Sequence, residues 1–319
     1  MLYVGVDLGG TNIAAGLVSP DGKVLIQDSV PTGVGRSYQE ILASMGSLIN
    51  DLVKKSGYGM HDIEAVGIGS PGAADMDKGE IVFANNLYWY NVPICSELQK
   101  HVQKPVYVDN DANVAALAEL AVGCAKGRKS LVLLTLGTGV GAGIVMDGKI
   151  VGGSHHVGAE IGHMIMDVNG EPCTCGNQGC FERYTSATAL IRDGRHMALG
   201  YPDCLIMAKA SGNLDNITAK IVIDAAREGD ELAMAIFDKY VRYLALGIIN
   251  IINILDPEVV ALGGGVSKAG DFLLDKVRAV MNAHIFYKKL AHADIMLSPL
   301  GNDAGVIGAA MLAVSGRIA

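Results

Sequence analysis

Two glycine-rich segments of this chain follow the same plan, and this repeat limits the possible folds more than any other feature. The first, LYVGVDLGGTNIAAGLVSPDGKVL, covers residues 2–25, and the second, LVLLTLGTGVGAGIVMDGKIV, covers residues 131–151. Each consists of an apolar strand, a Gly/Thr turn, a second strand, an Asp-Gly-Lys turn and a third strand. Asp-Gly pairs favour tight hairpins. The repeat predicts a duplicated unit, with one copy opening each of two domains.

Helices and strands alternate along the rest of the chain. Residues 37–57 place apolar side chains at helical spacing, with Ser37 and Glu40 spaced as a capping box and Gly57 as the stop. A strand at 106–108 leads into a helix that begins near Ala112, and a final helix begins at Asp303. Such alternation is typical of α/β layers. We expect a smaller domain of residues 1–111 plus 303–319 and a larger domain of residues 112–302.

Composition excludes several classes of protein. The apolar run LALGIINIINIL, at 244–255, is shorter than the roughly 20 residues of a membrane span and predicts a buried helix. The N-terminal residues lack the pattern of a secretory signal, so we expect a soluble cytoplasmic protein. The net charge of -8 argues against a partner that is a nucleic acid, and the basic residues at 126–130 predict a solvated loop.

Three glycine turns are candidates for binding phosphate. They are DLGGTN at 7–12, LGTGVGAG at 136–143 and ALGGGVS at 261–267. Glycine lets backbone N–H groups approach phosphate oxygens, and the threonine hydroxyls add donors. Their candidate ligands are Gly9, Gly10, Thr11, Asn12, Gly137, Thr138, Gly139, Gly263, Gly264 and Gly265. One such turn alone is more often a plain hairpin, but three together indicate a phosphate site, where Asp7 could hold Mg²⁺.

Two familiar nucleotide motifs are not present in their complete form. The first βα unit lacks the Gly-x-Gly-x-x-Gly pattern of a Rossmann fold, and GCAKGRKS has Arg128 where a P-loop requires its second glycine. The phosphate site therefore requires another architecture.

The segment DNDAN, at 109–113, lies where a strand meets the N-terminus of a helix. Asp111 has two possible roles there. It could cap the helix. It could also stay ionised at the helix N-terminus and accept a proton from a substrate hydroxyl, as the base of a phosphoryl transfer.

The stretch HMIMDVNGEPCTCGNQGCFE, at 163–182, combines three cysteines with a histidine. His163, Cys173, Cys175 and Cys180 form a four-ligand set suited to tetrahedral zinc. Cys-x-Cys differs from the commoner finger spacing, and the alternative is a loop of reduced, reactive thiols. A nucleic-acid finger is disfavoured because acidic residues, and almost no Lys or Arg, surround the cysteines.

Taken together, these motifs resemble the ROK family of sugar kinases and, within it, the bacterial glucokinases. The resemblance covers the whole chain and includes DLGGTN, GSPG, NDAN with ALAE, LGTGVGAG, EIGH, CTCGNQGCFE, LGGGVS and LGNDAGVIGAA, in this order. It implies an actin-like, hexokinase-type fold of two RNase H-like α/β domains, with ATP and sugar in the cleft between them. It also implies a homodimer or homotetramer.

The resemblance assigns roles to individual residues. Asp111 would be the base that accepts the proton of the 6-hydroxyl of a hexose, most simply glucose, before attack on the γ-phosphate of ATP. The other hydroxyl-binding residues would be Asn86, Asn110, Glu160, His163 and Glu182. Zinc would be structural, fixing His163 and Glu182.

The sequence departs from the family pattern at Asn12, at His155-His156 and at Ala159, where relatives usually carry glycine. N-acetylmannosamine, allose and fructose therefore stay open as substrates. A sugar-responsive repressor is a further alternative. We do not expect it, because the first glycine hairpin begins at residue 2 and the family's repressors carry a DNA-binding module before the sugar domain.

Overall fold

The computed structural model describes residues 1–316, which form two compact units. Unit 1 comprises Met1–Leu133, Gly143–Ala159 and the described residues from Pro299 onward. Unit 2 comprises Leu134–Ala142 and Glu160–Ser298. Within the described residues, no helix is both long enough and apolar enough to cross a lipid bilayer.

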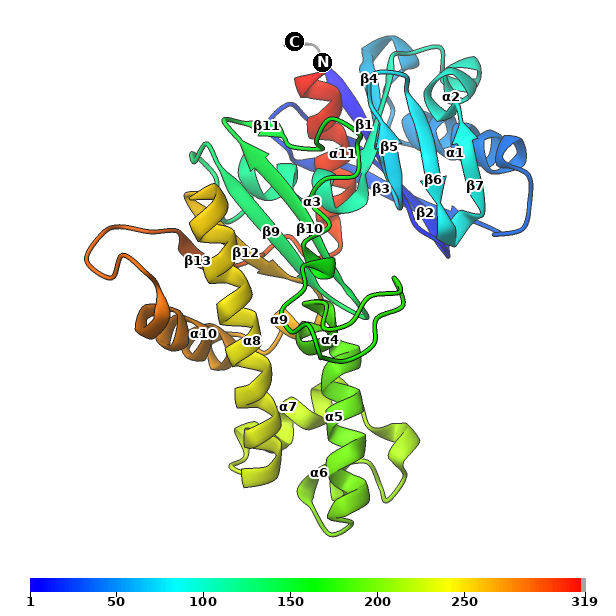
Figure 1. The fold of residues 1–319 in the computed structure, drawn as a ribbon. Coiled ribbons are helices and arrows are strands. Elements are labelled where there is room, and N and C mark those ends of the chain that lie inside the picture. Colours follow the sequence, from blue (N-terminus) through cyan, green and yellow to red (C-terminus); the bar gives the residue numbers. More distant parts are fainter. Residues whose placement is uncertain (317–319) are drawn as a thin grey trace. The chain divides into compact units, whose positions relative to one another are not determined.

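A five-stranded sheet with the order β3-β2-β1-β4-β8 forms the centre of unit 1 (Figure 1). Its strands are β1 (Leu2–Leu8), β2 (Asn12–Val18), β3 (Val24–Pro31), β4 (Ile63–Ser70) and β8 (Val106–Asn110). Strand β1 pairs antiparallel with β2 and parallel with β4, and β4 pairs parallel with β8. The hydrophobic core on one face includes α1 (Tyr38–Lys55) and α2 (Ile94–Val102), and the other includes α3 (Asp111–Ala121) and α11 (Asp303–Ser315).

Glycines in β1 and β4 bring α11 unusually close to this sheet. A Cβ atom at Gly5 would lie 1.9 Å from the carbonyl oxygen of Val306, and one at Gly67 would lie 1.7 Å from that of Ala309. No larger residue fits at either position without moving the helix. This close packing holds the start of α11 near the carboxyl end of β1.

A second five-stranded sheet repeats the strand order of the first. Its order is β11-β10-β9-β12-β13, and its strands are β9 (Leu131–Leu136), β10 (Val140–Met146), β11 (Lys149–Ile150), β12 (Val259–Gly263) and β13 (Asp294–Leu297). In both sheets the first three strands of the repeat are followed by two strands from later in the chain. The predicted duplication and α/β fold are therefore confirmed.

Local sequence signals also agree with the structure. Ser37 and Glu40 form the predicted capping box of α1. Asp147 and Gly148 both have positive φ, as the two central residues of a type I′ hairpin require. These short-range signals set the ends of several elements.

The remaining elements lie around the two sheets. Helices α4 (Glu182–Thr185), α5 (Ala187–Gly200), α6 (Leu205–Lys209), α7 (Ala219–Arg227), α8 (Glu231–Leu255), α9 (Gly264–Ser267) and α10 (Asp271–His284) belong to unit 2. A three-stranded sheet in unit 1 contains β5 (Ala73–Asp75), β6 (Glu80–Ala84) and β7 (Trp89–Val92). The 3-10 helices are η1 (Met60–Asp62), η2 (Asn85–Leu87), η3 (Ile161–His163) and η4 (Leu214–Asn216). Between Glu182 and Leu255 the chain is mainly helical.

Candidate active site

The carboxyl ends of three parallel strands meet in unit 1. Asp7 of β1 is in register with Gly69 of β4, and Gly69 is in register with Asp109 of β8. In α/β sheets, ligands bind beyond the carboxyl ends of such strands. This edge therefore carries the candidate site of unit 1.

The first glycine turn, between β1 and β2, is held by a residue that sequence reasoning missed. The N–H of Gly9 donates to the carbonyl oxygen of Asn12 at 2.9 Å. Thr32 is fully buried, and its hydroxyl donates to the carbonyl oxygen of Gly9 at 2.7 Å while its N–H donates to that of Thr11 at 2.8 Å. No local pattern marks Thr32, because its partners lie more than 20 residues earlier in the chain.

Asp7 lies between this turn and the start of α11. A Cβ atom at Gly305 would be 2.6 Å from Asp7 Oδ2, so glycine is needed where the helix passes the carboxyl group. Burial, and to a smaller extent the charge of Asp111, raises the pKa of Asp7 to about 6. A cation beside Asp7 would remove this electrostatic cost.

Asn110, not Asp111, caps helix α3. The Asn110 side-chain oxygen accepts hydrogen bonds from the N–H groups of Ala112 at 2.9 Å and Asn113 at 3.3 Å, and its amide donates to the carbonyl oxygen of Gly72. The capping role considered for Asp111 is therefore wrong. Asp111 is the first residue of the helix, and its exposed carboxylate accepts from the N–H of Ala112 at 2.8 Å. The helix N-terminus stabilises the ionised form of that carboxylate.

Asp109 is a buried neighbour that the sequence did not single out. Its Oδ1 accepts from the N–H of Asn110 at 2.6 Å and from the side-chain amide of Asn113 at 2.9 Å. Its Oδ2 is buried and has no hydrogen-bond partner within residues 1–316. Burial raises the pKa of Asp109, and the hydrogen bonds from the Asn113 amide and from the N–H of Asn110 partly oppose this effect.

Asn86 lies beside the first glycine turn. It belongs to η2, which joins β6 to β7, and its Cβ is 3.8 Å from where a Cβ of Gly10 would be. Unit 1 thus brings one candidate sugar ligand next to one candidate phosphate turn.

The other two glycine turns lie together in unit 2. A Cβ atom at Gly264, which has a φ of 81°, would lie 2.6 Å from the carbonyl oxygen of Leu136, just before the second turn. The N-terminus of α5 holds that turn, since the N–H of Ala187 donates to the carbonyl oxygen of Gly137 at 2.7 Å. The Thr188 hydroxyl likewise donates to the carbonyl oxygen of Thr138 at 2.7 Å.

Glu182 connects the second turn to the cysteine-rich stretch. Its Oε2 lies 2.7 Å from where a Cβ of Gly139 would be and accepts from the N–H of Val140 at 3.4 Å. Its Oε1 accepts from the thiol of Cys173 at 3.2 Å. A candidate hydroxyl ligand therefore contacts both a phosphate turn and the cysteine cluster.

The structure brings the four predicted zinc ligands together. All four ligand atoms lie within 4.8 Å of one another. Cys173 Sγ is 3.8 Å from His163 Nδ1, and Cys175 Sγ is 3.6 Å from Cys180 Sγ. A tetrahedral zinc ion, with Zn–S bonds of about 2.3 Å and Zn–N bonds of about 2.0 Å, separates its ligand atoms by roughly 3.5–3.8 Å. The donor set and its spacing both fit zinc.

The loop around this cluster is well anchored. Hydrogen bonding from the N–H of Asn177 lowers the pKa of Cys175 to about 7, whereas burial raises the pKa of Cys173 and of Cys180. Phe181 is fully buried against α8, where a Cβ at Gly247 would lie 2.3 Å from its ring. Glu160 precedes η3 and is exposed, and His163 ends that short helix. Because His163 Nδ1 faces the thiols, Nε2 is left for another ligand.

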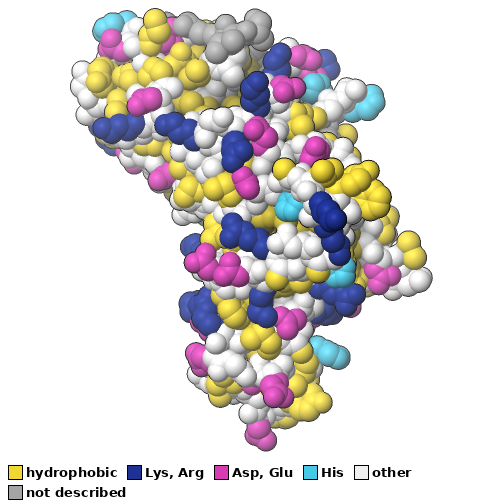
Figure 2. Space-filling model, turned by 90° about the vertical axis from the view of Figure 1, so that its left-hand side faces the viewer, with side chains coloured by type: hydrophobic (Ala, Val, Ile, Leu, Met, Phe, Trp, Pro, Cys, Tyr) yellow, Lys and Arg dark blue, Asp and Glu magenta, His cyan; other side chains and the backbone are white. Residues whose placement is uncertain are grey.

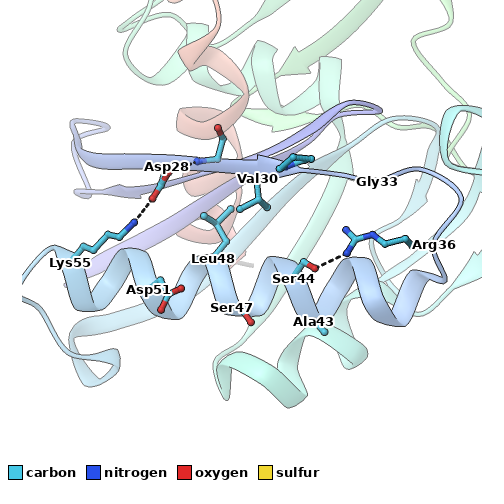
Figure 3. Close-up of a pocket in the computed structure, with 12 residues that line it drawn as sticks. Asp28, Val30, Gly33, Arg36, Ala43, Ser44, Ser47, Leu48, Asp51 and Lys55 are labelled. Atoms are coloured by element: carbon cyan, nitrogen blue, oxygen red, sulfur yellow. Dashed lines mark hydrogen bonds and ion pairs between the residues drawn. The ribbon is translucent and has the colours of Figure 1, made fainter.

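The lining of a groove between α1 and β3 contains none of these residues (Figure 3). It has a volume of about 690 Å³, and its walls include Val30 and Leu48. A Lys55–Asp28 ion pair crosses one end, and Arg36 donates to Ser44 at the other. None of its lining residues is a predicted site residue.

Comparison with known proteins gives a consistent result. The model of the ROK family matches residues 3–315. The glucokinase of Thermotoga maritima is 38% identical over 310 residues, which cover 97% of this chain and 96% of the relative. The xylose repressor of Caldicellulosiruptor bescii is 32% identical over 98% of this chain and 78% of the repressor. The crystal structure of a ROK family glucokinase from Streptomyces griseus, in complex with glucose and AMPPNP, aligns with a TM-score of 0.81 at 34% identity, covering 99% of this chain and 100% of that one.

Proposed function

The chain belongs to the ROK family, and on this premise we propose that it transfers the γ-phosphoryl group of ATP to the 6-hydroxyl of a hexose, with glucose as the preferred substrate. The observation that carries the proposal is the position of Asp111, at a helix N-terminus beyond the carboxyl end of β8. Full-length similarity to a glucokinase, and to one solved with glucose and AMPPNP, supports the substrate pair.

In the proposed reaction Asp111 accepts the proton of the sugar 6-hydroxyl. The hydroxyl oxygen forms a bond to the γ-phosphorus of ATP, and ADP leaves. Backbone N–H groups of the three glycine turns, with the hydroxyls of Thr11 and Thr138, would donate to phosphate oxygens. The remaining sugar hydroxyls would be bound by Asn86, Asn110, Glu160, His163 and Glu182. Asn110 would do so with the free hydrogen of its amide, because its oxygen already caps α3.

Asp7 is the proposed ligand for Mg²⁺, directly or through water. Its buried carboxyl group next to the charge of Asp111 fits a cation, which would stabilise the ionised forms of both. When bound, Mg²⁺ would neutralise charge on the phosphates.

We propose a structural zinc at His163, Cys173, Cys175 and Cys180. The measured ligand spacing supports this assignment, and four protein ligands leave no position for an activated water. The ion would fix the ring of His163 directly, and it would fix Glu182 through the loop, since Glu182 follows the ligand Cys180 by two residues. Thiolate ligands and six free cysteines suit a reducing compartment, so we propose a cytoplasmic protein.

The surface charge supports small-molecule partners. On the face in Figure 2, Lys and Arg are interspersed with Asp and Glu instead of forming the continuous basic surface that nucleic acid requires. A homodimer or homotetramer is proposed from the family resemblance, and light scattering after gel filtration tests it.

A sugar-responsive regulator is the second candidate, because the xylose repressor is 32% identical across 98% of this chain. The two candidates differ in turnover. A regulator would bind sugar without consuming ATP, whereas a kinase consumes ATP only when its sugar is present.

The test is a panel of glucose, mannose, allose, fructose, N-acetylmannosamine and N-acetylglucosamine in a coupled ATP-consumption assay. We expect the highest kcat/KM with glucose. A higher value with another sugar would reassign the substrate, because side chains that bind hydroxyls reject the wrong epimer strongly. Sugar binding without ATP consumption would instead favour the regulator.

A further inference from the structure

The loop of residues 152–159 has a backbone conformation that requires explanation. The N–H of Gly158 donates to the carbonyl oxygen of Gly152 at 2.9 Å, which closes the loop on itself. His156 and Ala159 have φ values of 57° and 66°, in the left-handed region that residues other than glycine rarely adopt. Such strain persists only where surrounding contacts hold it, and it often marks a functional segment.

His156 supplies the contact that holds this loop. Its Nε2 lies 3.5 Å from Oδ1 of Asp75, a buried residue at the end of β5. The contact ties the loop of residues 152–159 to the three-stranded sheet of unit 1.

The surrounding charges favour an ion pair over a metal site. Asp75, Asp77 and His156 have ligand atoms within 4.8 Å of one another, as a metal site would. However, the ammonium of Lys78 lies 2.9 Å from Asp75 Oδ2, and the N–H of Lys78 donates to Oδ1 at 3.0 Å. A metal ion would have to compete with this lysine for the same carboxylate.

The loop leads directly to a candidate ligand, because Glu160 follows His156 by four residues. We propose that His156 is a positioning residue for sugar binding: by holding the loop of residues 152–159 against Asp75, it fixes the position of Glu160. This inference rests on the proposed function. It adds a residue that affects sugar affinity without touching the substrate.

Two amide variants test the contact at nearly constant chemistry. Asn tolerates the left-handed backbone conformation of residue 156. In H156N, however, the side-chain amide is too short to reach Asp75. Gln in H156Q carries the same amide one methylene farther, near the place of the imidazole Nε2. The matched control is H155N, since His155 is the exposed neighbour in the same loop. Each variant is assayed for kcat, for KM of both substrates and for thermal stability.

Loss of the contact with Asp75 should raise the sugar KM of H156N about tenfold, with kcat and the ATP KM changed less than about twofold. H156Q should recover most of the affinity, and H155N should match the wild type. Equal sugar KM values for H156N and the wild type would overturn the inference. The same rise in sugar KM in H155N would also overturn it. So would a parallel loss of kcat, ATP affinity and melting temperature in H156N, because that pattern indicates general destabilisation.

Fluorescence of Trp89 gives an independent measure of sugar binding. Trp89 is the only tryptophan, and it lies three residues after Asn86. If the wild type binds sugar but consumes no ATP, the proposed kinase function fails, while the dissociation constants of the same variants still test His156. A tenfold weaker dissociation constant in H156N alone would then support the positioning role, and an unchanged one would reject it.

Discussion

The glycine turns after β1 and β9 occupy the same place in two sheets of equal strand order, but different parts of the chain hold them. Thr32, which follows β3, holds the first turn through the carbonyl oxygen of Gly9. The N-terminus of α5 holds the second through Ala187 and Thr188. The repeat therefore includes the strands and the turn, but the residues that hold the turn differ between the two copies.

The chemistry beside the two turns differs still more. Unit 1 collects carboxylates, with Asp7, Asp109 and Asp111 at the ends of its parallel strands. Unit 2 places Glu182 and the Cys/His cluster next to Gly139. Under the proposed function, the repeated elements would supply backbone donors for phosphate, while residues outside the repeat would supply proton transfer and sugar recognition.

The largest expected effect comes from removing the base in unit 1. We expect D111N to lower kcat by roughly 10²- to 10⁴-fold, because the amide cannot accept the hydroxyl proton. Sugar binding, followed by Trp89 fluorescence, should change less than about threefold. The control is D271N, since Asp271 is likewise the first residue of a helix, α10. A near-normal rate in D111N would remove Asp111 as the base.

Removing the metal tests the corresponding claim for unit 2. Elemental analysis should find one zinc per chain. C175S removes one of the four ligands, at an exposed position, and should therefore lose the zinc. We expect a fall in kcat/KM for sugar of about 10- to 100-fold, as for groups that orient other ligands. C95S, outside the cluster, should retain both zinc and activity. A folded, zinc-free and fully active enzyme would contradict this role.

The smallest effect is a pH-dependent gain in stability from D7N. Burial raises the pKa of Asp7 from 3.8 to about 6, so the folded state resists ionisation that the unfolded chain allows. The free-energy cost of ionising Asp7 in the folded state is absent below about pH 3.8, grows as the pH rises and is complete above about pH 6. Without divalent cations, D7N should raise the free energy of unfolding at pH 7.5 by at most about 3 kcal/mol, and hardly at pH 4.

Urea unfolding at both pH values measures this difference, with D51N, at an exposed position of α1, as the control. A gain of equal size at pH 4 and pH 7.5 would show that ionisation of Asp7 is not the cause. Lower stability of D7N at pH 7.5 would contradict the burial argument altogether.

Features with a local signal could be predicted from the sequence. The capping box at Ser37 and Glu40, the hairpin at Asp147-Gly148 and the duplicated unit of three strands all follow from patterns within one or two dozen residues. The Cys/His cluster could also be predicted, because its four candidate zinc ligands lie within an 18-residue stretch and their chemistry is distinctive.

Features that depend on tertiary contact could not be predicted. Asn and Asp are equally good helix caps, so only the end of β8 decides that Asn110 caps α3. Gly305 matters because α11 passes Asp7, which lies about 300 residues earlier in the chain. His156 contacts Asp75, which lies 81 residues earlier in the chain, and no pattern in either segment predicts this contact.

The most direct test of the central claim is the position of the transferred phosphate. Wild-type enzyme is incubated with ATP, Mg²⁺ and glucose labelled with ¹³C at carbon 6, and the products are followed by ¹³C and ³¹P NMR. The account predicts glucose 6-phosphate and ADP in equal amounts, with coupling between carbon 6 and phosphorus, and no ATP consumption with 6-deoxyglucose. Phosphate on another carbon, or no sugar phosphate at all, would contradict it.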